Sequence, residues 1–195
     1  MQEFSTQVRN ALAAYLTKFP EEVAGLTQLQ HQLDIDSGDI GHRANMRGHI
    51  TTSAVVVDHT HENAILIHHK VYNDWLQPGG HYEGTGSLPE SAAREVTEET
   101  GVVDPVLHGW CKRHGAPIDI DTHAIAAHAG KQEGAHVHHD FLYLMVAPPG
   151  CTLVPQLAEV YGVKWLPIAE LSTLPGKRLP RLATRVRAVL DGAIS

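Results

Sequence analysis

The sequence has few cysteines and no long apolar run. Cys111 and Cys151 are the only two cysteines among 195 residues, and they lack the paired spacing of a zinc site. We therefore expect two free thiols in a reducing compartment, with a disulfide between them as the alternative. No stretch approaches the ~20 apolar residues that a membrane-spanning helix requires. The sequence accordingly predicts no membrane partner.

An excess of basic residues is also missing. The chain has 15 Lys and Arg against 22 Asp and Glu, for a formal net charge of −7. A general nucleic-acid binder would carry a basic stripe, so we expect no nucleic-acid partner. Residues 1–10 lack the basic start and apolar run of a signal peptide, which predicts a cytoplasmic protein. A hydrophobic content of 43% is enough for a packed core.

The hydrophobic pattern predicts more strands than helices. Helical spacing of apolar residues predicts helices, and runs rich in Thr and Val predict strands. The first two strands should form a hairpin, and the mixture predicts an α+β fold in which helices pack against a mixed sheet. The segment 34–48 is polar and should be a loop. Helices are expected at 4–18, 21–33, 87–100, 168–174 and 179–190, and strands at 50–58, 64–70, 106–112, 117–127, 141–147 and 162–166.

The helix expected after residue 87 has clear start and stop signals. Ser87 and Glu90 fit a capping box, in which each side chain bonds the other residue's backbone N–H. Gly101 suits the left-handed position that ends a helix. Before the helix, Gly79 and Gly80 let backbone pass close to a ligand, because glycine has no Cβ.

This helix concentrates carboxylates. Glu95, Glu98 and Glu99 share one side, because helical neighbours stand three and four residues apart. Such carboxylates repel each other unless a cation sits among them, and Arg94 neutralises only part of the charge. Hard divalent cations take oxygen ligands of this kind, often together with substrate phosphates. A solvated helix face supported by i,i+4 ion pairs is the alternative.

The segment from residue 80 to residue 102 resembles the Nudix box, G-x5-E-x7-R-E-U-x-E-E-x-G-U, in which U is a bulky aliphatic residue. Gly86 stands where the family usually has its first glutamate, which tends to support the loop and the box arginine. Glu83 or Glu90 would have to take over that support. The residues that match are Gly80, Arg94, Glu95, Val96, Glu98, Glu99, Gly101 and Val102.

The resemblance implies a fold and a chemistry. The expected fold is the Nudix α/β/α sandwich over residues 49–195, preceded by an N-terminal helical extension and linker over 1–48. The favoured role of this extension is packing or dimerisation, so a homodimer is among the expected partners. The implied reaction is attack of water on a diphosphate with Mg²⁺ or Mn²⁺ as cofactor. Such phosphoryl chemistry mainly requires positioning and charge stabilisation.

Carried over by position, the resemblance also implies roles for single residues. Glu95, Glu98 and Glu99 would hold the metal, together with the backbone carbonyl of Gly79. Arg94 would orient the glutamates. The general base is left open between the box glutamates, such as Glu98 or Glu95, and Glu159 outside the box. A solvated loop glutamate is the alternative role of Glu159.

Histidines and arginines outside the box are candidates for substrate binding. Alternate residues of a strand share a face, so His138 lies with Asp140, and His123 lies with Asp119 and Asp121. Imidazole and carboxylate together can bind a transition metal, or contact phosphate when protonated. Because such groups suit a buried core poorly, we expect them at a substrate mouth. Solvated strand-end residues are the alternative. The candidate substrate contacts are His123, His138, His139, Arg43 and Arg47.

Three functions follow. The first is a metal-dependent Nudix hydrolase that cleaves a diphosphate in a small, phosphorylated substrate of the nucleoside-diphosphate type. The second is a binding or regulatory module that has lost turnover, a hypothesis that Gly86 favours. The third is a phosphatase or isomerase that acts on sugar or prenyl phosphates.

Overall fold

One strand rich in Val and Thr runs through the centre of the molecule. The computed structural model describes residues 2–36, 39–127 and 134–194. β1 (His49–Val57) is buried along its whole length. It pairs in parallel with β7 (His136–Val146) over nine residue pairs, and antiparallel with β2 (Asn63–His69) and β4 (Gly79–His81). A strand covered on both faces carries a continuous run of apolar or small residues instead of an alternating pattern.

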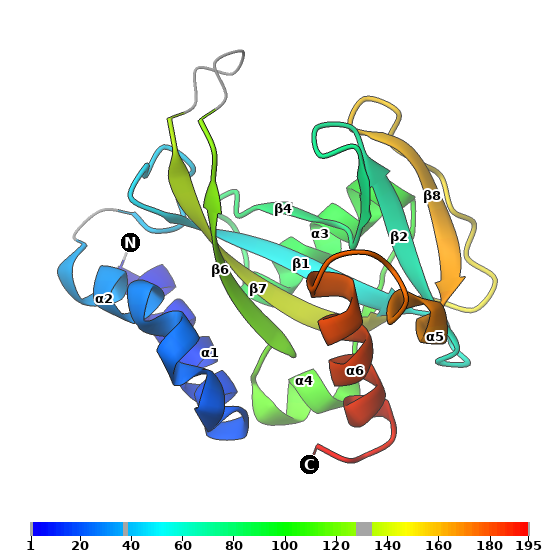
Figure 1. Cartoon of the computed structure of the whole chain (residues 1–195), viewed down its shortest axis with the longest axis horizontal. Coiled ribbons are helices and arrows are strands. Elements are labelled where there is room, and N and C mark those ends of the chain that lie inside the picture. Colours follow the sequence, from blue (N-terminus) through cyan, green and yellow to red (C-terminus); the bar gives the residue numbers. More distant parts are fainter. Residues whose placement is uncertain (1, 37–38, 128–133, 195) are drawn as a thin grey trace.

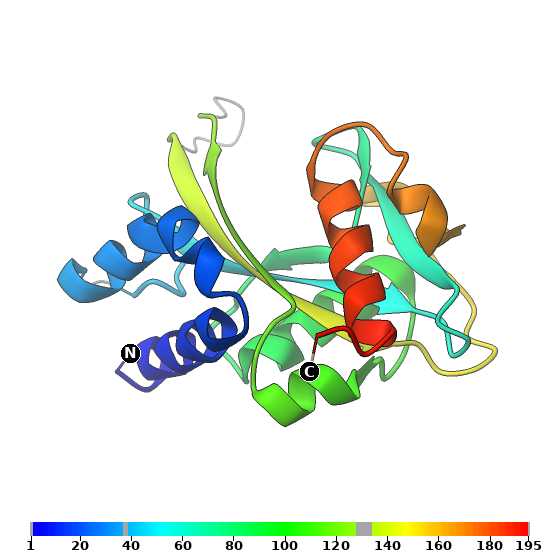
Figure 2. The ribbon, with the colours of Figure 1, turned by 60° about the horizontal axis from the view of Figure 1, so that its bottom comes forward.

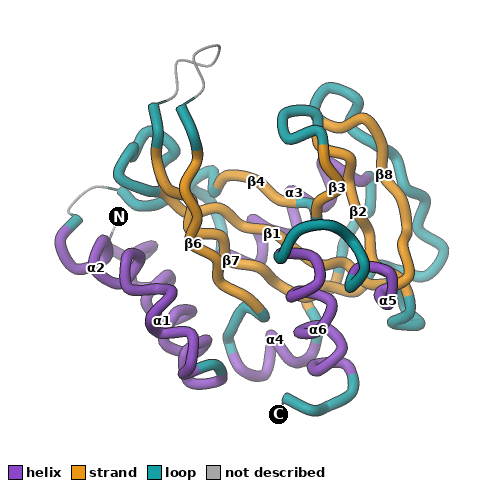
Figure 3. The backbone as a smooth tube through the Cα atoms, viewed as in Figure 1, coloured by secondary structure: helices purple, strands orange, loops and turns teal. Residues whose placement is uncertain are grey.

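The other strands extend this centre toward both edges. β3 (Asp74–Leu76) and β8 (Val160–Pro167) pair with β2, whereas β5 (Val106–Leu107) and β6 (Asp119–Ile125) pair with β7. The described strands form one eight-stranded sheet that contains both parallel and antiparallel pairs. The predicted hairpin of β1 and β2 and the predicted mixed sheet are therefore confirmed (Figure 3).

Helices cover both faces of the sheet. α3 (Leu88–Thr100) packs behind β1 in the view of Figure 1, with Ala92 and Val96 fully buried. α6 (Arg178–Leu190) lies in front, next to the short α5 (Ile168–Leu171), and buries Leu182 and Val186. Among the described residues, no helix combines the length and apolar character needed to cross a membrane.

The N-terminal helices belong to the same hydrophobic core as the sheet. α1 (Gln2–Lys18), the 3-10 helix η1 (Pro20–Leu26) and α2 (Thr27–Ile35) gather beside β6 (Figures 1 and 2). Tyr15 packs against Phe19, and Phe19 packs against Trp110, with ring centroids 4.8 Å and 6.1 Å apart. This arrangement supports a packing role for the extension. The domain boundary at residue 48 stays a prediction.

Several expected elements differ from those observed. The strand expected at 106–112 contains only the two residues of β5, and α4 (Gly109–His114) follows it. His108 starts this helix because its side chain accepts a hydrogen bond from the Trp110 N–H, a cap that a strand-like apolar pattern conceals. The helix expected at 21–33 begins as η1 and becomes α-helical only at Thr27. β3 and β4 are short strands outside the ranges in which strands were expected.

β7 also starts earlier than expected, at His136 instead of Phe141. Its polar first half pairs in register with β6, so that His123 faces His138 and Asp121 faces Asp140. The sequence had suggested that these groups suit a core poorly. His136, His138, His139 and Asp140 are nevertheless all buried, and distant parts of the chain supply polar partners, such as Gln32 for His139 and Arg178 for Asp140.

Candidate active site on α3

α3 begins and ends where the sequence predicted. The Ser87 side chain accepts a hydrogen bond from the Glu90 N–H, and the Glu90 carboxylate accepts the Ser87 N–H at 2.6 Å, which completes the capping box. Gly101 ends the helix with φ of 73°, in the left-handed region that glycine adopts without strain. These caps fix where the helix begins and ends. The carboxylates between them project toward the start of β4.

Arg94 connects the carboxylates of the box. Its Nη1 donates to Glu98 Oε2 at 2.8 Å, and its Nη2 donates to Glu95 Oε1 at 2.7 Å. Nη2 also donates to the backbone carbonyl of His81 at 3.0 Å. One guanidinium thus ties two box glutamates to the strand that follows the glycine loop. The orienting role expected for Arg94 would use these contacts, and it stays a prediction.

Two box glutamates are buried, and the third is not. Only 8% of Glu95 and 2% of Glu99 is exposed, whereas the Glu98 side chain is half-exposed. Burial raises the pKa of Glu95 to about 7, although nearby Arg94 opposes the shift. Burial likewise raises the pKa of Glu99 to about 8, opposed by the hydrogen bond from the Gly79 N–H. Both carboxyls therefore take up protons more readily near neutral pH than an ordinary glutamate, and a bound cation would oppose this effect.

The glycines of the preceding loop are required by close contacts. A Cβ on Gly80 would lie 2.6 Å from the Glu95 carboxylate, and a Cβ on Gly79 would lie 2.8 Å from the Thr52 carbonyl oxygen. The Gly79 N–H donates to Glu99 Oε2 at 2.8 Å. The loop thus touches the carboxylates directly. Three carboxylates beside a glycine backbone form an oxygen-rich donor set with one nearby arginine, and this set fits a hard divalent cation.

Gly86 has a conformational reason to be glycine. Its φ is +72°, a region that residues with a Cβ rarely adopt. A Cβ there would also lie 3.0 Å from Glu90 Oε2, the acceptor of the capping box. Glu83 Oε2 lies 3.6 Å from Arg94 Nη1, whereas the Glu90 carboxylate serves the cap. Of the two residues expected to replace the missing box glutamate, Glu83 is the one in contact with the box arginine.

A cavity of about 1110 Å³ opens over these carboxylates. Most residues that the sequence selected for metal or substrate binding line it, although they come from separate parts of the chain. Two predicted substrate contacts do not line it. Arg47 extends to Asp36, with 3.4 Å between Nη1 and Oδ1, and His139 is fully buried. The predicted residues that line the cavity are Gly79, Arg94, Glu95, Glu98, Glu99, Glu159, Arg43, His123 and His138.

His138 and His139 lie on opposite faces of β7. His139 hydrogen-bonds to Thr122 Oγ1 at 2.9 Å and to Gln32 Oε1 of α2 at 3.1 Å, so it anchors the N-terminal helices. Burial lowers the pKa of His138 to about 2 and that of His139 to about 4, and neighbouring imidazoles add to both shifts. Neutral imidazoles at this strand argue against the alternative in which protonated histidines bind phosphate.

The sequence did not identify two basic residues that also line the cavity. Lys70 follows β2, and Arg178 reaches the cavity from the start of α6. Asp140, which the sequence placed beside His138, accepts hydrogen bonds from Thr51 Oγ1 at 3.0 Å and Ser53 Oγ at 2.6 Å, and it contacts Arg178 as well. No local signal marks the two basic residues, because β2, α6 and β7 meet only in the folded chain.

Comparison with known families decides the ancestry of this site. A model of the NUDIX domain matches residues 48–188, which include all of α3 and the strands around it. The chain belongs to the NUDIX domain family. Relatives include a probable DHNTP pyrophosphohydrolase of Lactococcus lactis, 28% identical over 57% of this chain and 63% of that protein. Phosphatase NudJ of Escherichia coli is 25% identical over 74% of this chain and 84% of its own length.

Solved structures of NUDIX proteins share the fold. A Caenorhabditis elegans Ap4A hydrolase superposes with a TM-score of 0.57 at 16% identity, over 73% of this chain and 98% of the other. The dihydroneopterin triphosphate pyrophosphohydrolase of E. coli gives a TM-score of 0.52 at 17% identity, over 69% and 90% of the two chains. These likenesses confirm the α/β/α sandwich with a mixed sheet.

Proposed function

We propose that the chain is a hydrolase that uses Mg²⁺ or Mn²⁺ to cleave a diphosphate linkage in a small substrate of the nucleoside-diphosphate type. One observation carries the proposal. Glu95, Glu98 and Glu99 all line a cavity large enough for a nucleotide, and Arg94 hydrogen-bonds to the first two. The names of the NUDIX relatives, two of which are pyrophosphohydrolases, support the same class of reaction.

The residues of the chain divide the task. Glu95, Glu98, Glu99 and the Gly79 carbonyl would hold the cation, and Arg94 keeps two of these carboxylates in place. The cation supplies charge to neutralise the diphosphate and acidifies the attacking water. Arg43, His123 and His138 line the cavity and are the proposed substrate contacts. Arg47 and His139 are not retained in this role, because neither lines the cavity.

Two glutamates are candidates for the general base. Glu98 is half-exposed and lines the cavity on α3, which leaves its carboxylate accessible to a water molecule. Glu159 is exposed, also lines the cavity and lies directly before β8. A base must lie within hydrogen-bond reach of the water that it deprotonates. Both residues satisfy the requirement for access, and substitution of each distinguishes them.

A phosphatase is the second candidate, because NudJ carries that name and aligns over 74% of this chain. The two activities differ in their products. We would incubate the protein with nucleotides, nucleotide sugars, dinucleoside polyphosphates and prenyl diphosphates, each with Mg²⁺ or Mn²⁺, and identify products by mass. Nucleoside monophosphate with a second phosphorylated product supports the proposed hydrolase, whereas free phosphate alone supports the phosphatase. Tight binding without any product supports the binding-module hypothesis.

A further inference from the structure

Five histidines converge where β1, β4, β6 and β7 meet beside the cavity. The pairing of β1 with β7 places His49 opposite His138, and the pairing of β6 with β7 places His123 opposite His138. His81 enters from β4, and His136 precedes His138 on β7. The imidazole rings of His49, His81 and His138 lie 4.8 to 5.1 Å apart between centroids.

Three of these side chains bring one ring nitrogen each close to the other two. Nitrogens of His49, His81 and His138 all lie within 4.8 Å of one another. His49 is 1% exposed and His138 is 8% exposed, so the group sits largely out of water. Clustered buried imidazoles are costly unless their nitrogens are satisfied. We propose that His49, His81 and His138 form a binding site for a Zn²⁺-like transition-metal cation, separate from the carboxylate site on α3.

The hydrogen bond of His49 fixes the nitrogen that faces the site. Its Nδ1 lies 3.2 Å from the backbone carbonyl oxygen of Asn45. A carbonyl oxygen can only accept, so Nδ1 carries the proton and Nε2 keeps the lone pair in the neutral ring. Metal-binding histidines commonly have such a carbonyl partner, which sets the tautomer and the ring orientation. His49 therefore has the outer hydrogen bond of a metal ligand.

A chain of hydrogen bonds orients His138 in a similar way. His136 Nδ1 lies 2.8 Å from the Gly134 carbonyl oxygen, so Nδ1 is the donor and Nε2 of neutral His136 is an acceptor. His136 Nε2 lies 3.1 Å from His138 Nε2, which must then donate. In this tautomer Nδ1 of His138 keeps its lone pair for a cation, and His138 would then contact substrate through the bound cation. His136 is thus a positioning residue for His138.

The donor chemistry separates this site from the box. Imidazole nitrogens favour Zn²⁺ and its transition-metal neighbours, whereas carboxylate and carbonyl oxygens favour Mg²⁺ and Mn²⁺. A tetrahedral zinc site brings its nitrogens to about 3.3 Å from one another, from Zn–N distances of about 2.0–2.1 Å. Small rotations of the three imidazole rings would bring their nitrogens from the observed spacing, within 4.8 Å, to this distance. His81 and His138 line the cavity, so the fourth ligand position faces the space proposed for substrate.

The two sites are close enough to serve the same cavity. The His81 backbone carbonyl accepts a hydrogen bond from Arg94 Nη2 at 3.0 Å, so the imidazole site adjoins the box arginine. A catalytic-type zinc site has three protein ligands and one open position. A cation at the three histidines would accordingly present its open position to a water or to an oxygen of the bound substrate.

Direct metal titration tests the inference. We would remove metal from protein without a histidine tag, add excess Mg²⁺, and titrate Zn²⁺ by calorimetry. We expect one equivalent of Zn²⁺ to bind despite the Mg²⁺. Titration with Co²⁺ should give the intense visible absorption bands of a tetrahedral nitrogen site. Failure to retain one equivalent, or the weak spectrum of an octahedral oxygen site, would overturn the proposal.

Matched variants locate the cation. His81→Ala and His138→Asn should weaken Zn²⁺ binding by about 100-fold or more, since changes outside the ligands alone cost 10- to 100-fold. His59→Ala, which removes an exposed imidazole after β1, should bind Zn²⁺ like the parent. His81 is only half-buried, so His81→Ala should fold and can test the site even if His138→Asn does not fold. Unchanged affinity in folded His81→Ala refutes the site.

A carboxylate variant keeps this test independent of the proposed reaction. Glu98→Gln should retain the Zn²⁺ affinity and the Co²⁺ spectrum of the parent, whatever it does to hydrolysis. Loss of Zn²⁺ binding in Glu98→Gln would place the cation on α3 and overturn the histidine site. If the parent protein binds Zn²⁺ as expected but hydrolyses no substrate, the histidine site is supported and the proposed function is refuted.

Discussion

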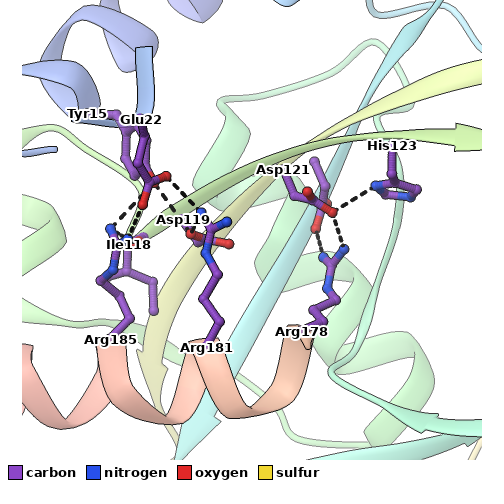
Figure 4. A network of polar contacts seen from close by, with 10 residues as sticks. Tyr15, Glu22, Ile118, Asp119, Asp121, His123, Arg178, Arg181 and Arg185 are labelled. Carbon is purple, nitrogen blue, oxygen red and sulfur yellow. Dashed lines mark hydrogen bonds and ion pairs between the residues drawn. The ribbon is translucent and has the colours of Figure 1, made fainter. Parts of the chain in front are cut away.

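Arg178 Nη1 lies 2.9 Å from Asp121 Oδ2, and this ion pair joins the start of α6 to β6 at the wall of the cavity. The same guanidinium contacts the buried Asp140 of β7. Figure 4 shows that Arg181 and Arg185, farther along the same face of α6, reach back to acidic partners on β6 and η1. The terminal helix is thus held across the sheet by a row of arginines spaced at helical intervals.

Removal of the Arg178 side chain should destabilise the fold more than removal of the Arg187 side chain on the same helix. Arg178→Ala leaves Asp140, which is 4% exposed, without its cationic partner. We expect a loss of about 2 kcal/mol in the free energy of unfolding, below the value for a fully buried pair because Arg178 is partly solvated. Arg187 lies 3.6 Å from the exposed Glu62, so Arg187→Ala should cost less than about 0.5 kcal/mol. Urea denaturation measures both, and equal losses would contradict this account.

Glu98→Gln should lower turnover by about 100-fold or more, because the change removes an anionic oxygen from the proposed metal site or the general base itself. Its side chain is half-exposed, so the thermal stability should change little. Steady-state kinetics on the best substrate, with circular dichroism of the variant, provide the measurement.

Glu159→Gln is the matched comparison for the base. A fall in kcat as large as that of Glu98→Gln, with unchanged Mg²⁺ or Mn²⁺ affinity, would assign the general base to Glu159. A kcat equal to that of the parent would leave this role with a glutamate of α3. Parental turnover in a double Glu98→Gln, Glu99→Gln variant would remove the box from catalysis altogether.

Gly86→Glu should not improve the enzyme. A side chain at φ of +72° is strained, and we expect a loss of about 1–2 kcal/mol in stability. Turnover should stay within about tenfold, or 1.4 kcal/mol of barrier, because Glu83 already contacts Arg94. Gly86→Ala carries the same backbone strain without a carboxylate and is the control for it. A large gain in activity confined to Gly86→Glu would instead favour the module that has lost turnover.

Cys151 should react with thiol reagents in the native protein, and Cys111 should not. Cys111 is 2% exposed, and burial raises its pKa to about 12, so its thiolate is scarce at pH 8. We expect a disulfide-exchange reagent to label one thiol per native chain and two in denaturant. Cys151→Ala should abolish the native reaction.

The contribution of Cys111 to the stability of the fold depends on pH with a definite sign. Its thiol keeps its proton in the fold to higher pH than in the unfolded chain, so its contribution to stability declines as pH rises from about 9 toward 12. Absence of labelling even in denaturant would indicate the alternative disulfide, although both cysteines are free in the structure.

The local sequence determined α3 and its chemistry. The capping box, the terminal glycine and the spacing of Glu95, Glu98 and Glu99 each involve residues within about one helical turn, so interactions between near neighbours decide them. Alternation along a strand likewise placed His138 and Asp140 on one face. Neither pattern depends on how distant parts of the chain meet.

Only the tertiary structure decided which residues share the cavity. Strand alternation could not say that His138 faces the substrate space and His139 faces Gln32, because α2 determines which face is covered. The pairing of β1 with β7 and β4 brings His49 and His81 into the histidine cluster. Arg178 contacts Asp140 from the last helix. These contacts join residues far apart in the sequence, and such contacts are fixed by the packing of the whole core, which no short pattern encodes.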